Sequence, residues 1–308
     1  MKTLRIGTRK SALALWQAEH VRARLLEREP GLRAEIVKIT TSGDRILDRP
    51  LAAVGGKGLF IKELEQALFD DRIDLAVHSM KDLTVTLPES LHVAAVLERA
   101  DPRDAFVSNR YRRPSELPDG ARIGTSSLRR QCQLRARYPR CRVVDLRGNV
   151  NTRLTKLDAG EFEAIILAVA GLERLGFADR ITQALDPADS LPAVAQGAIC
   201  VEARRDDAET SRRLAALDHG PTRRCVSAER ALNASLDGGC QVPIAAHAEL
   251  RADRIFLRAL VGDPDGSRVL RSEADGPADQ PQELGERVAR ALIECGAKAI
   301  LDKAYGRA

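Results

Sequence analysis

The hydrophobic and polar positions of the first hundred residues alternate between strand and helix patterns. Leu4–Gly7 and Ala34–Thr40 read as strands, with a helix between them that Ser11 is placed to cap. Asp74–Met80 is short and nearly all apolar, which is typical of a strand buried in a parallel sheet. Gly58–Phe69 carries apolar residues near one face and predicts a second helix. Helices placed between such strands predict an α/β domain.

The same alternation restarts after Arg99–Asp104, a charged segment broken by proline, which we interpret as a crossover into a second domain. The strands and the helix predicted there are Ala121–Gly124, Arg142–Leu146, Ala164–Val169 and Ser127–Tyr138. Ser190–Pro192 reads as a second crossover, and Ala198–Ala203 as a strand that returns to the first domain. Two α/β domains joined by two crossings, with a cleft between them, are typical of hinged proteins that bind small anions.

From Pro221 onward the pattern changes to a helix, three strands and a final helix from about Gln282. The strands are predicted at Ile244–Leu250, Arg254–Val261 and Arg268–Ser272. Strands paired by hairpins and followed by a helix indicate a small α+β domain. We therefore expect domain 1 to hold residues 1–98 and 198–217, domain 2 residues 103–192, and domain 3 residues 220–308.

The composition is that of a folded soluble protein, with 44% hydrophobic and 30% charged residues among 308. The longest apolar run, around Ala164–Ala170, is far short of the about 20 residues that a membrane helix needs. The N-terminus passes straight into a strand pattern without an export signal, so we expect a cytoplasmic protein without membrane contact. The six cysteines form no CxxC pair and no zinc spacing with histidine, which predicts free thiols and no metal site.

Arginine dominates the positive charge of the chain. Of the 49 Lys and Arg residues nine are lysines, which leaves 40 arginines, although genomic base composition accounts for this bias equally well. Arginine binds carboxylates and phosphates through two parallel hydrogen bonds. Aromatic residues make up only 3%, which argues against a surface that stacks nucleic-acid bases. A small polyanion is therefore the expected ligand.

Three strand-to-helix junctions each carry arginine: Arg5–Ser11, Gly124–Arg130 and Leu146–Arg153. The backbone N–H groups and the dipole at the start of a helix favour an anion there. The alternative for the second junction is a capping serine followed by two solvated arginines. Three such junctions together indicate several negative groups at one site.

Two further motifs place reactive groups where α/β active sites lie. The buried strand ends in His78-Ser79-Met80-Lys81-Asp82, and Asp82, beside many cations, is expected to remain ionised. A surface turn with a Lys–Asp pair is the alternative.

Cys240 follows two glycines in a loop between a helix and a strand, which predicts an accessible thiol that serves as an attachment point. A structural loop cysteine is the alternative there. The Gly-rich segment 55–58 lacks the spacing of a nucleotide-binding loop and indicates a mobile lid.

Taken together, these motifs resemble the porphobilinogen deaminase (hydroxymethylbilane synthase) family over essentially the whole chain. The resemblance rests on Thr8–Ala18, Val54–Glu65, Ala76–Asp82, Asp101–Ser108, Gly124–Leu134, Leu146–Leu157, Ala164–Gly176 and Leu236–Pro243. It implies two domains like those of type II periplasmic binding proteins, an active cleft between them, and the small α+β domain at the C-terminus. It also implies an enzyme of tetrapyrrole biosynthesis, a monomer, that joins four porphobilinogen molecules head to tail with loss of ammonia. Ala53, Thr84 and Ala195 depart from the lysine, proline and glycine usual in the family, which leaves details of the lid and hinge open.

The resemblance also implies roles for individual residues. Asp82 would be the catalytic carboxylate, and Cys240 would carry a dipyrromethane cofactor through a thioether. The cofactor would further contact Lys81, Ser127, Arg129, Arg130, Arg147 and Gly171, and the substrate Arg9, Ser79, Arg147, Arg153, Arg174 and Gln196. Lys57 and Phe60 would belong to the lid. The competing hypothesis is a non-catalytic protein that binds small anions on the same scaffold, which would have no use for the Cys240 loop.

Overall fold

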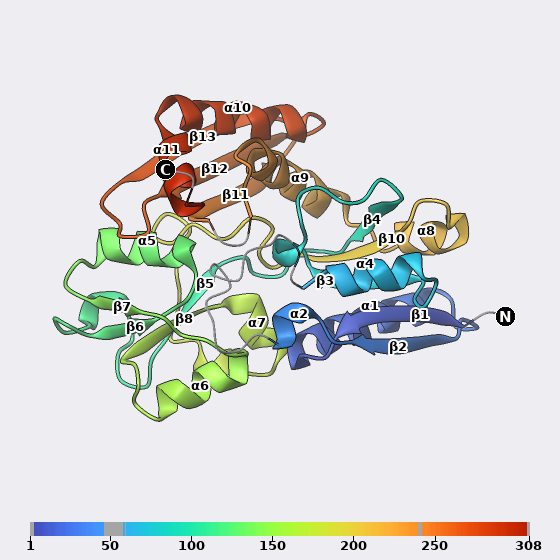
Figure 1. Ribbon diagram of the computed structural model, residues 1–308, viewed down its shortest axis with the longest axis horizontal. Coiled ribbons are helices and arrows are strands. Elements are labelled where there is room, and N and C mark those ends of the chain that lie inside the picture. The colour runs from blue at the N-terminus through green and yellow to red at the C-terminus, as the bar shows by residue number, and fades with distance from the viewer. Residues whose placement is uncertain (1–2, 46–57, 59, 240–241, 307–308) are drawn as a thin grey trace. The chain divides into compact units, whose positions relative to one another are not determined.

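The computed structural model describes residues 3–45, 58, 60–239 and 242–306 of the chain. It divides into two compact units (Figure 1). Unit 1 consists of Met1–Ala100 and Ala198–Arg223, and unit 2 of Asp101–Gly197 and Arg224–Ala308. The chain thus leaves unit 1 once and returns to it.

Unit 1 is built on one five-stranded sheet of order β2-β1-β3-β10-β4. Its strands are β1 (Leu4–Arg9), β2 (Ala34–Ile39), β3 (Leu75–Ser79), β4 (Leu91–Val96) and β10 (Ile199–Arg204). β1 runs parallel to both β2 and β3, whereas β10 pairs antiparallel with β3 and β4. The predicted return of Ala198–Ala203 to the first sheet is confirmed, and β4 was not predicted.

Helices cover both faces of this sheet. α1 (Ala12–Arg28) starts where predicted, because the Ser11 hydroxyl accepts a hydrogen bond from the Ala14 N–H at 3.3 Å. It packs Val21 and other apolar side chains against Leu75 and Val77 of β3, while α4 (Lys62–Phe69) packs against Ala76 on the opposite face. The helix predicted over Gly58–Phe69 begins four residues late, because Gly58 has φ +84° and its carbonyl accepts a hydrogen bond from the Ile61 N–H, as in a turn. The remaining helical segments of this unit are α2 (Ser42–Arg45), α8 (Ala208–Ala215) and the 3₁₀ turn Met80–Asp82.

Unit 2 contains a second five-stranded sheet, of order β7-β6-β8-β5-β9. Its strands are β5 (Asp104–Val107), β6 (Arg122–Gly124), β7 (Arg142–Val144), β8 (Ala164–Ala168) and β9 (Gln183–Ala184). Its helices are α5 (Leu128–Arg137), α6 (Val150–Asp158) and α7 (Val169–Arg174), with a 3₁₀ turn at Ala178–Arg180 and another at Pro114–Glu116. Phe106, Ile123 and Ile165 are fully buried at its centre. β5 opens at Asp104, which the sequence analysis placed in a crossover.

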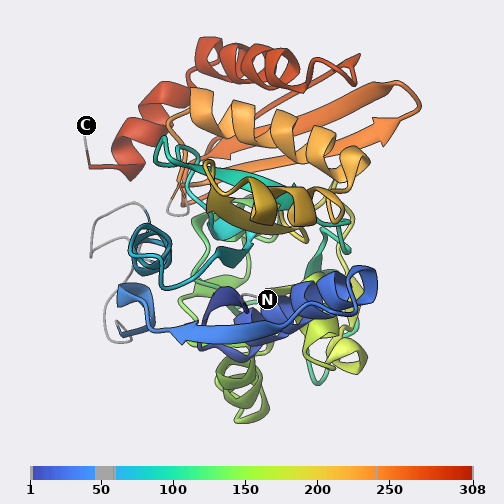
Figure 2. The ribbon, with the colours of Figure 1, turned by 90° about the vertical axis from the view of Figure 1, so that its right-hand side faces the viewer.

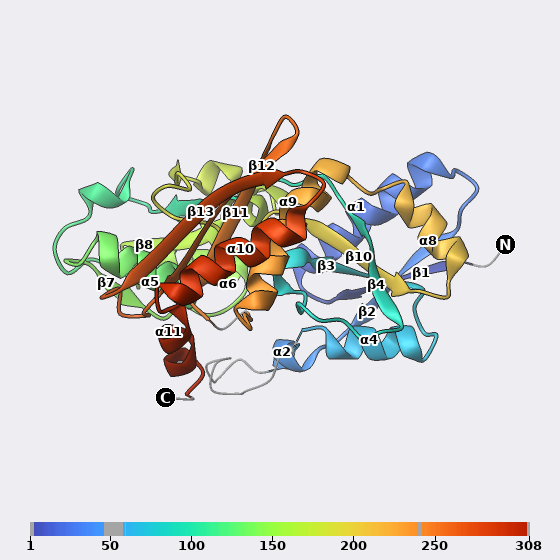
Figure 3. The ribbon, with the colours of Figure 1, turned by 90° about the horizontal axis from the view of Figure 1, so that it is seen from above.

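The C-terminal part of unit 2 is a three-stranded antiparallel sheet covered by helices. The strands are β11 (Ile244–Arg251), β12 (Arg254–Gly262) and β13 (Val269–Pro277), and the helices are α9 (Gly220–Ser235), α10 (Pro281–Glu294) and α11 (Ala297–Ala304). Figures 2 and 3 show α10 lying over this sheet. A Cβ added at Gly285 would meet the Ala228 carbonyl, so α10 and α9 pack closely at that point. β13 runs five residues further than predicted, and α11 was not predicted.

Two observations complete the description of the fold. Ser190 and Leu191, predicted as the second crossover, are buried inside unit 2, and the chain passes into unit 1 after Gly197. Within the described residues, no helix combines the length and the apolar character needed to cross a bilayer.

Candidate active site

A pocket in unit 1 lies where β1 and β3 end. Arg9 is the last residue of β1, and Ser79 is the last residue of β3, so the two parallel strands deliver both side chains to one edge of the sheet. Asp82 follows on the 3₁₀ turn after β3. All three side chains line the pocket, together with Ser11, Leu13, Ala14, Gln17, Phe60, Ile61, Val77 and His78. The structure therefore brings together the predicted carboxylate, Arg9 and Ser79.

Two contacts fix the walls of this pocket. The guanidinium carbon of Arg9 lies 4.0 Å from the centre of the Phe60 ring, a cation–π contact. The Phe60 ring also fills the space beside Gly43, where a Cβ would clash with it. On the other wall, the Gln17 amide nitrogen donates to the Ser79 hydroxyl at 2.8 Å. Gln17 is almost fully buried and is a pocket residue that sequence reasoning missed.

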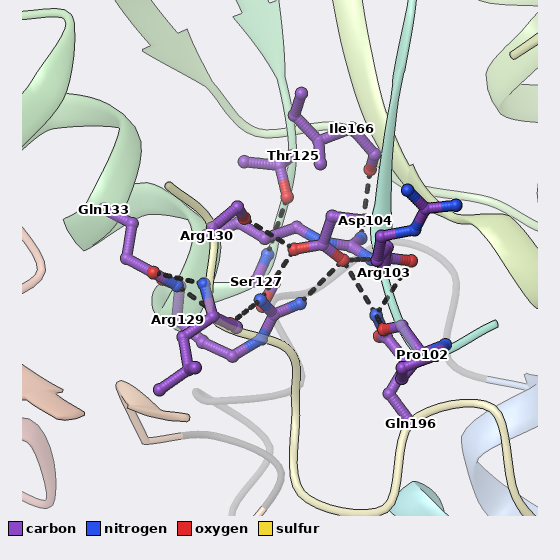
Figure 4. Close-up of polar contacts among 12 residues, drawn as sticks. Pro102, Arg103, Asp104, Thr125, Ser127, Arg129, Arg130, Gln133, Ile166 and Gln196 are labelled. Atoms are coloured by element: carbon purple, nitrogen blue, oxygen red, sulfur yellow. Dashed lines mark hydrogen bonds and ion pairs between the residues drawn. The ribbon is translucent and has the colours of Figure 1, made fainter. Parts of the chain in front are cut away.

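In unit 2, the Asp104 carboxylate gathers two of the predicted arginines (Figure 4). Arg129 donates from Nη1 to Oδ2 at 2.7 Å and from Nη2 to Oδ1 at 3.1 Å, while Arg130 donates from Nε at 3.0 Å and Nη2 at 2.7 Å, both to Oδ1. The Ser190 hydroxyl and the Gln196 amide also donate to Asp104, at 2.9 Å each. Asp104 is fully buried, and both arginines are 6% exposed or less. The alternative of two solvated arginines is therefore wrong.

The charges in this cluster hold one another in the ionised state. Burial would raise the pKa of Asp104, but the charges of Arg129 and Arg130 and their hydrogen bonds hold it well below its usual range. Burial lowers the pKa of Arg130, and the neighbouring Asp104 opposes that effect. Nε of Arg129 is buried and has no hydrogen-bond partner among the described residues. The cluster consequently retains an unused donor.

Three further predicted arginines lie near α6 and α7: Arg147 precedes α6, Arg153 is in its first turn, and Arg174 ends α7. Arg147 donates from Nε to an Asp145 carboxylate oxygen at 3.2 Å, and Arg153 donates from Nε to the Gly148 carbonyl at 2.8 Å. Burial, together with the charge of Arg130, lowers the pKa of Arg153 to about 10. Burial likewise lowers the pKa of Arg174 to about 10, although Nη2 of Arg174 donates to the Gly197 carbonyl at 2.7 Å. An anion bound beside these guanidinium groups would offset the penalty of their burial.

The remaining predicted residues fall into three groups. Ser127 is the N-cap residue of α5, but its side chain makes no capping hydrogen bond, and Gly171 is buried in α7. Lys81 stands in the 3₁₀ turn beside Asp82. Cys240 and Lys57 lie outside the described residues, as do residues 55–57 of the predicted lid. The flanking Gly238 is described, and a Cβ there would clash with the Asn233 side chain, so a larger residue would require that side chain to move.

The donor set of unit 2 fits a ligand with several carboxylates. Arg129, Arg130, Arg147 and Arg153 supply four positive charges near the two carboxylates of Asp104 and Asp145. The buried unpaired Nε of Arg129 is a donor that such a ligand could use. The sequence analysis found the arginines but missed Asp104 and Ser190. The one signal for Asp104 is a charged residue directly before the apolar run Ala105–Val107.

Comparisons with known proteins agree with this chemistry. Residues 4–212 match the family model "Porphobilinogen deaminase, dipyromethane cofactor binding domain", and residues 223–294 match "Porphobilinogen deaminase, C-terminal domain". A porphobilinogen deaminase of Chromobacterium violaceum is 57% identical over 301 residues, which cover 98% of this chain and 97% of that protein.

Solved structures with a similar fold include two bacterial binding proteins. A putative methionine-binding lipoprotein of Bacillus subtilis aligns with a TM-score of 0.44 and 13% identity, over 70% of this chain and 90% of that one. A periplasmic substrate-binding protein of an ABC transporter from Coxiella burnetii aligns with a TM-score of 0.44 and 12% identity, over 70% and 92%. The assignment rests on the sequence matches: the chain belongs to the porphobilinogen deaminase (hydroxymethylbilane synthase) family, enzymes that carry a dipyrromethane cofactor and join four porphobilinogen molecules head to tail with loss of ammonia.

Proposed function

We propose that Asp82 is the catalytic carboxylate of this enzyme and that its pocket binds the reacting end of porphobilinogen. The observation that carries the proposal is the placement of Asp82 in one pocket with Arg9, Ser79 and Phe60. Arg9 supplies a positive charge for a substrate carboxylate, and Asp82 supplies a negative charge for the aminomethyl end. A pocket with both charges holds a substrate that carries both.

Asp82 acts on the charge that develops as ammonia leaves. Departure of the amine leaves positive charge on the substrate's methylene carbon and pyrrole ring. A fixed carboxylate beside that charge stabilises the transition state more than the bound substrate, and therefore raises the rate. The competing hypothesis, a non-catalytic anion binder, has no need of a carboxylate at this position and is not favoured by the family assignment.

The arginines of unit 2 bind carboxylates of the cofactor and of the substrate. Arg129, Arg130 and Arg147, with Lys81, Ser127 and Gly171, would hold the cofactor, and Arg153, Arg174 and Gln196 the substrate. Bound to Cys240 by a thioether, the cofactor supplies an anchored end to which pyrroles are added. Arg129 and Arg130 keep their positive charges in a buried setting because Asp104 stabilises them.

The cysteine chemistry of the described residues is consistent with Cys240 as the attachment point. Burial raises the pKa of Cys132 to about 11, which makes it a poor nucleophile, and Cys200 and Cys225 are also buried. Cys295 is exposed, on the turn after α10. It is therefore the natural comparison for any test of the Cys240 thiol.

We also propose the three-domain organisation and a cytoplasmic monomer. The separate sheets of unit 2 and the separate family match over residues 223–294 support a third domain at 220–308. Porphobilinogen is the expected partner, with no nucleic acid and no membrane.

The test of Asp82 is single-turnover release of ammonia by the wild type, Asp82→Asn and Asp82→Glu. Asn keeps the shape and removes the charge, so its rate should fall about 10²–10³-fold, or roughly 3–4 kcal/mol. Glu keeps the charge and should retain more activity than Asn. A wild-type rate in Asp82→Asn, with the cofactor mass present, would remove Asp82 from the mechanism.

A further inference from the structure

A second pair of ionisable side chains lies beneath the Asp82 pocket. Nε2 of His78 is 3.0 Å from Oε2 of Glu202, and these side chains are 4% and 0% exposed. In the antiparallel pairing of β3 with β10, Cys200 stands opposite His78 and Glu202 opposite Ala76, so the pair is a diagonal contact across neighbouring strands. Both side chains therefore lie on the face of the sheet that α4 covers.

Glu202 is poorly satisfied for a fully buried carboxylate. Its Oε1 has no hydrogen-bond partner within the part of the chain that the structure describes. Burial raises the pKa of Glu65 on α4, and the nearby charge of Glu202 raises it further. A buried ion pair is weak evidence for stability, because removing its charges from water offsets most of the attraction between them. A contribution to stability therefore does not explain why these two ionisable side chains are buried together, whereas a role in the reaction does.

His78 connects this buried pair to the pocket. His78 is one of the residues that line the pocket that contains Asp82. Its Nε2 is engaged by Glu202. A histidine held at one ring nitrogen by a carboxylate has the other nitrogen free to exchange a proton, in a fixed orientation.

We infer that His78, oriented by Glu202, carries the proton in each condensation. In the same reaction Asp82 stabilises the positive charge that develops on the substrate. This inference rests on the proposed function of the pocket. In each condensation the C–N bond to the protonated aminomethyl group breaks and ammonia leaves with the bonding electrons. A C–C bond forms to the free α-carbon of the adjoining pyrrole, which then loses its proton to Nδ1 of His78. The imidazolium passes this proton to the released ammonia, which leaves as ammonium, so protons and charge balance.

Charged groups surround His78. Glu202 of β10 and Glu65 of α4 are the acidic groups near it, and Lys62 of α4 lies near Glu65. Arg9 of β1 and Asp82 line the pocket with His78, and Lys81 precedes Asp82 in the 3₁₀ turn. Because the Glu202 carboxylate orients the imidazole, its loss should lower the rate of the condensation without weakening substrate binding.

The experiment measures ammonia release over a range of substrate concentrations for the wild type, His78→Gln and Glu202→Gln, with the cofactor content of each read from its intact mass. Gln at position 78 can still donate to Glu202 but cannot carry a proton. We expect His78→Gln to keep its cofactor mass and its KM within about twofold and to lose about 10²-fold in kcat. Glu202→Gln should also keep its cofactor mass and KM and should lose about tenfold in kcat, because the imidazole is no longer oriented. His92→Gln, at a half-buried histidine of β4 in the same sheet, is the control and should match the wild type.

Each outcome decides the inference. An unchanged kcat in His78→Gln, or a raised KM with an unchanged kcat, would overturn it. Loss of cofactor mass and of thermal stability in both variants would also overturn it, because the pair would then be structural. If only His78→Gln fails to fold, a lower kcat at an unchanged KM in Glu202→Gln still supports the inference, and an unchanged kcat in that variant refutes it. The proposed function of Asp82 fails separately, through an unchanged rate in Asp82→Asn.

Discussion

Oδ1 of Asp104 lies 2.7 Å from Nη2 of Arg130 in the interior of unit 2, where Asp104 is fully buried and Arg130 nearly so. Arg130 also donates from Nη1 to the Ile166 carbonyl at 3.0 Å. Its side chain therefore links Asp104 of β5 to the neighbouring strand β8. An ion pair with this degree of burial is stable only while both partners are present.

Replacing Asp104 with Asn should destabilise the protein by about 3–5 kcal/mol, because two guanidinium groups would remain buried without a compensating charge. The pKa of Asp104 is held below its ordinary value, so its stabilising effect is complete above about pH 4 and disappears as the pH falls below that. The free energy of unfolding, measured in urea at pH 7 and below pH 4, should therefore differ most between wild type and variant at pH 7. Equal stabilities at pH 7 would contradict the ion-pair interpretation.

Arg130→Lys tests the geometry of the same site without removing its charge. Lysine cannot donate to Asp104 and to the Ile166 carbonyl through separate groups, so the variant should lose about 1–3 kcal/mol and most of its cofactor mass. Arg147→Lys, at a less buried arginine, should reduce the cofactor mass with little change in stability. The control is Arg290→Lys, on the exposed face of α10, which should alter neither quantity. Equal tolerance at all three positions would show that the arginines do not bind the cofactor.

The proposed thioether at Cys240 predicts a covalent mass excess. The denatured wild type should be heavier by two pyrrole units, carried on the peptide that contains Cys240, and Cys240→Ser should lack this excess. Cys295→Ser removes an exposed thiol elsewhere in the chain and should leave the mass excess unchanged. Active enzyme with an unmodified mass would refute the attachment.

A hairpin of the third sheet offers a test of the fold alone. Ala252, between β11 and β12, is exposed and has φ +54°, a conformation that glycine adopts without strain. Ala252→Gly should therefore stabilise the protein by about 0.5–1 kcal/mol, seen as a higher urea midpoint. Ala299→Gly, at an exposed position inside α11, should destabilise it by about 1 kcal/mol. A fall in stability for both variants would contradict the assigned turn.

The elements that the sequence predicted well are those with a strong local signal. β3 and β8 are short apolar runs between turns, and α1 has a capping serine at its start. The start of α4 was misplaced because the apolar residues at Leu59 and Ile61 continue the helical pattern, although Gly58 turns the chain. α11 was missed because Gly296, with φ +96°, separates it from α10 by a turn that a single helical pattern does not reveal.

The candidate site was predictable in its charged residues and not in their partners. Arg129 and Arg130 belong to a recognisable junction, but Asp104 lies 25 residues before Arg129, and Ser190 lies 86 residues after Asp104. Glu202 is 124 residues from His78. Contacts over such separations follow from the order of strands in a sheet. Local patterns do not encode that order.

The position of β10 has a consequence for how the protein is made. β10 lies between β3 and β4 and is the only described strand that pairs with β4. It is translated about a hundred residues after β4, once the chain has passed through the first part of unit 2. Until Ile199–Arg204 leaves the ribosome, β3 and β4 present open edges, and His78 lacks the buried Glu202 carboxylate that it contacts. This first sheet therefore closes only after the arginine-bearing strands and helices of the second have been synthesised.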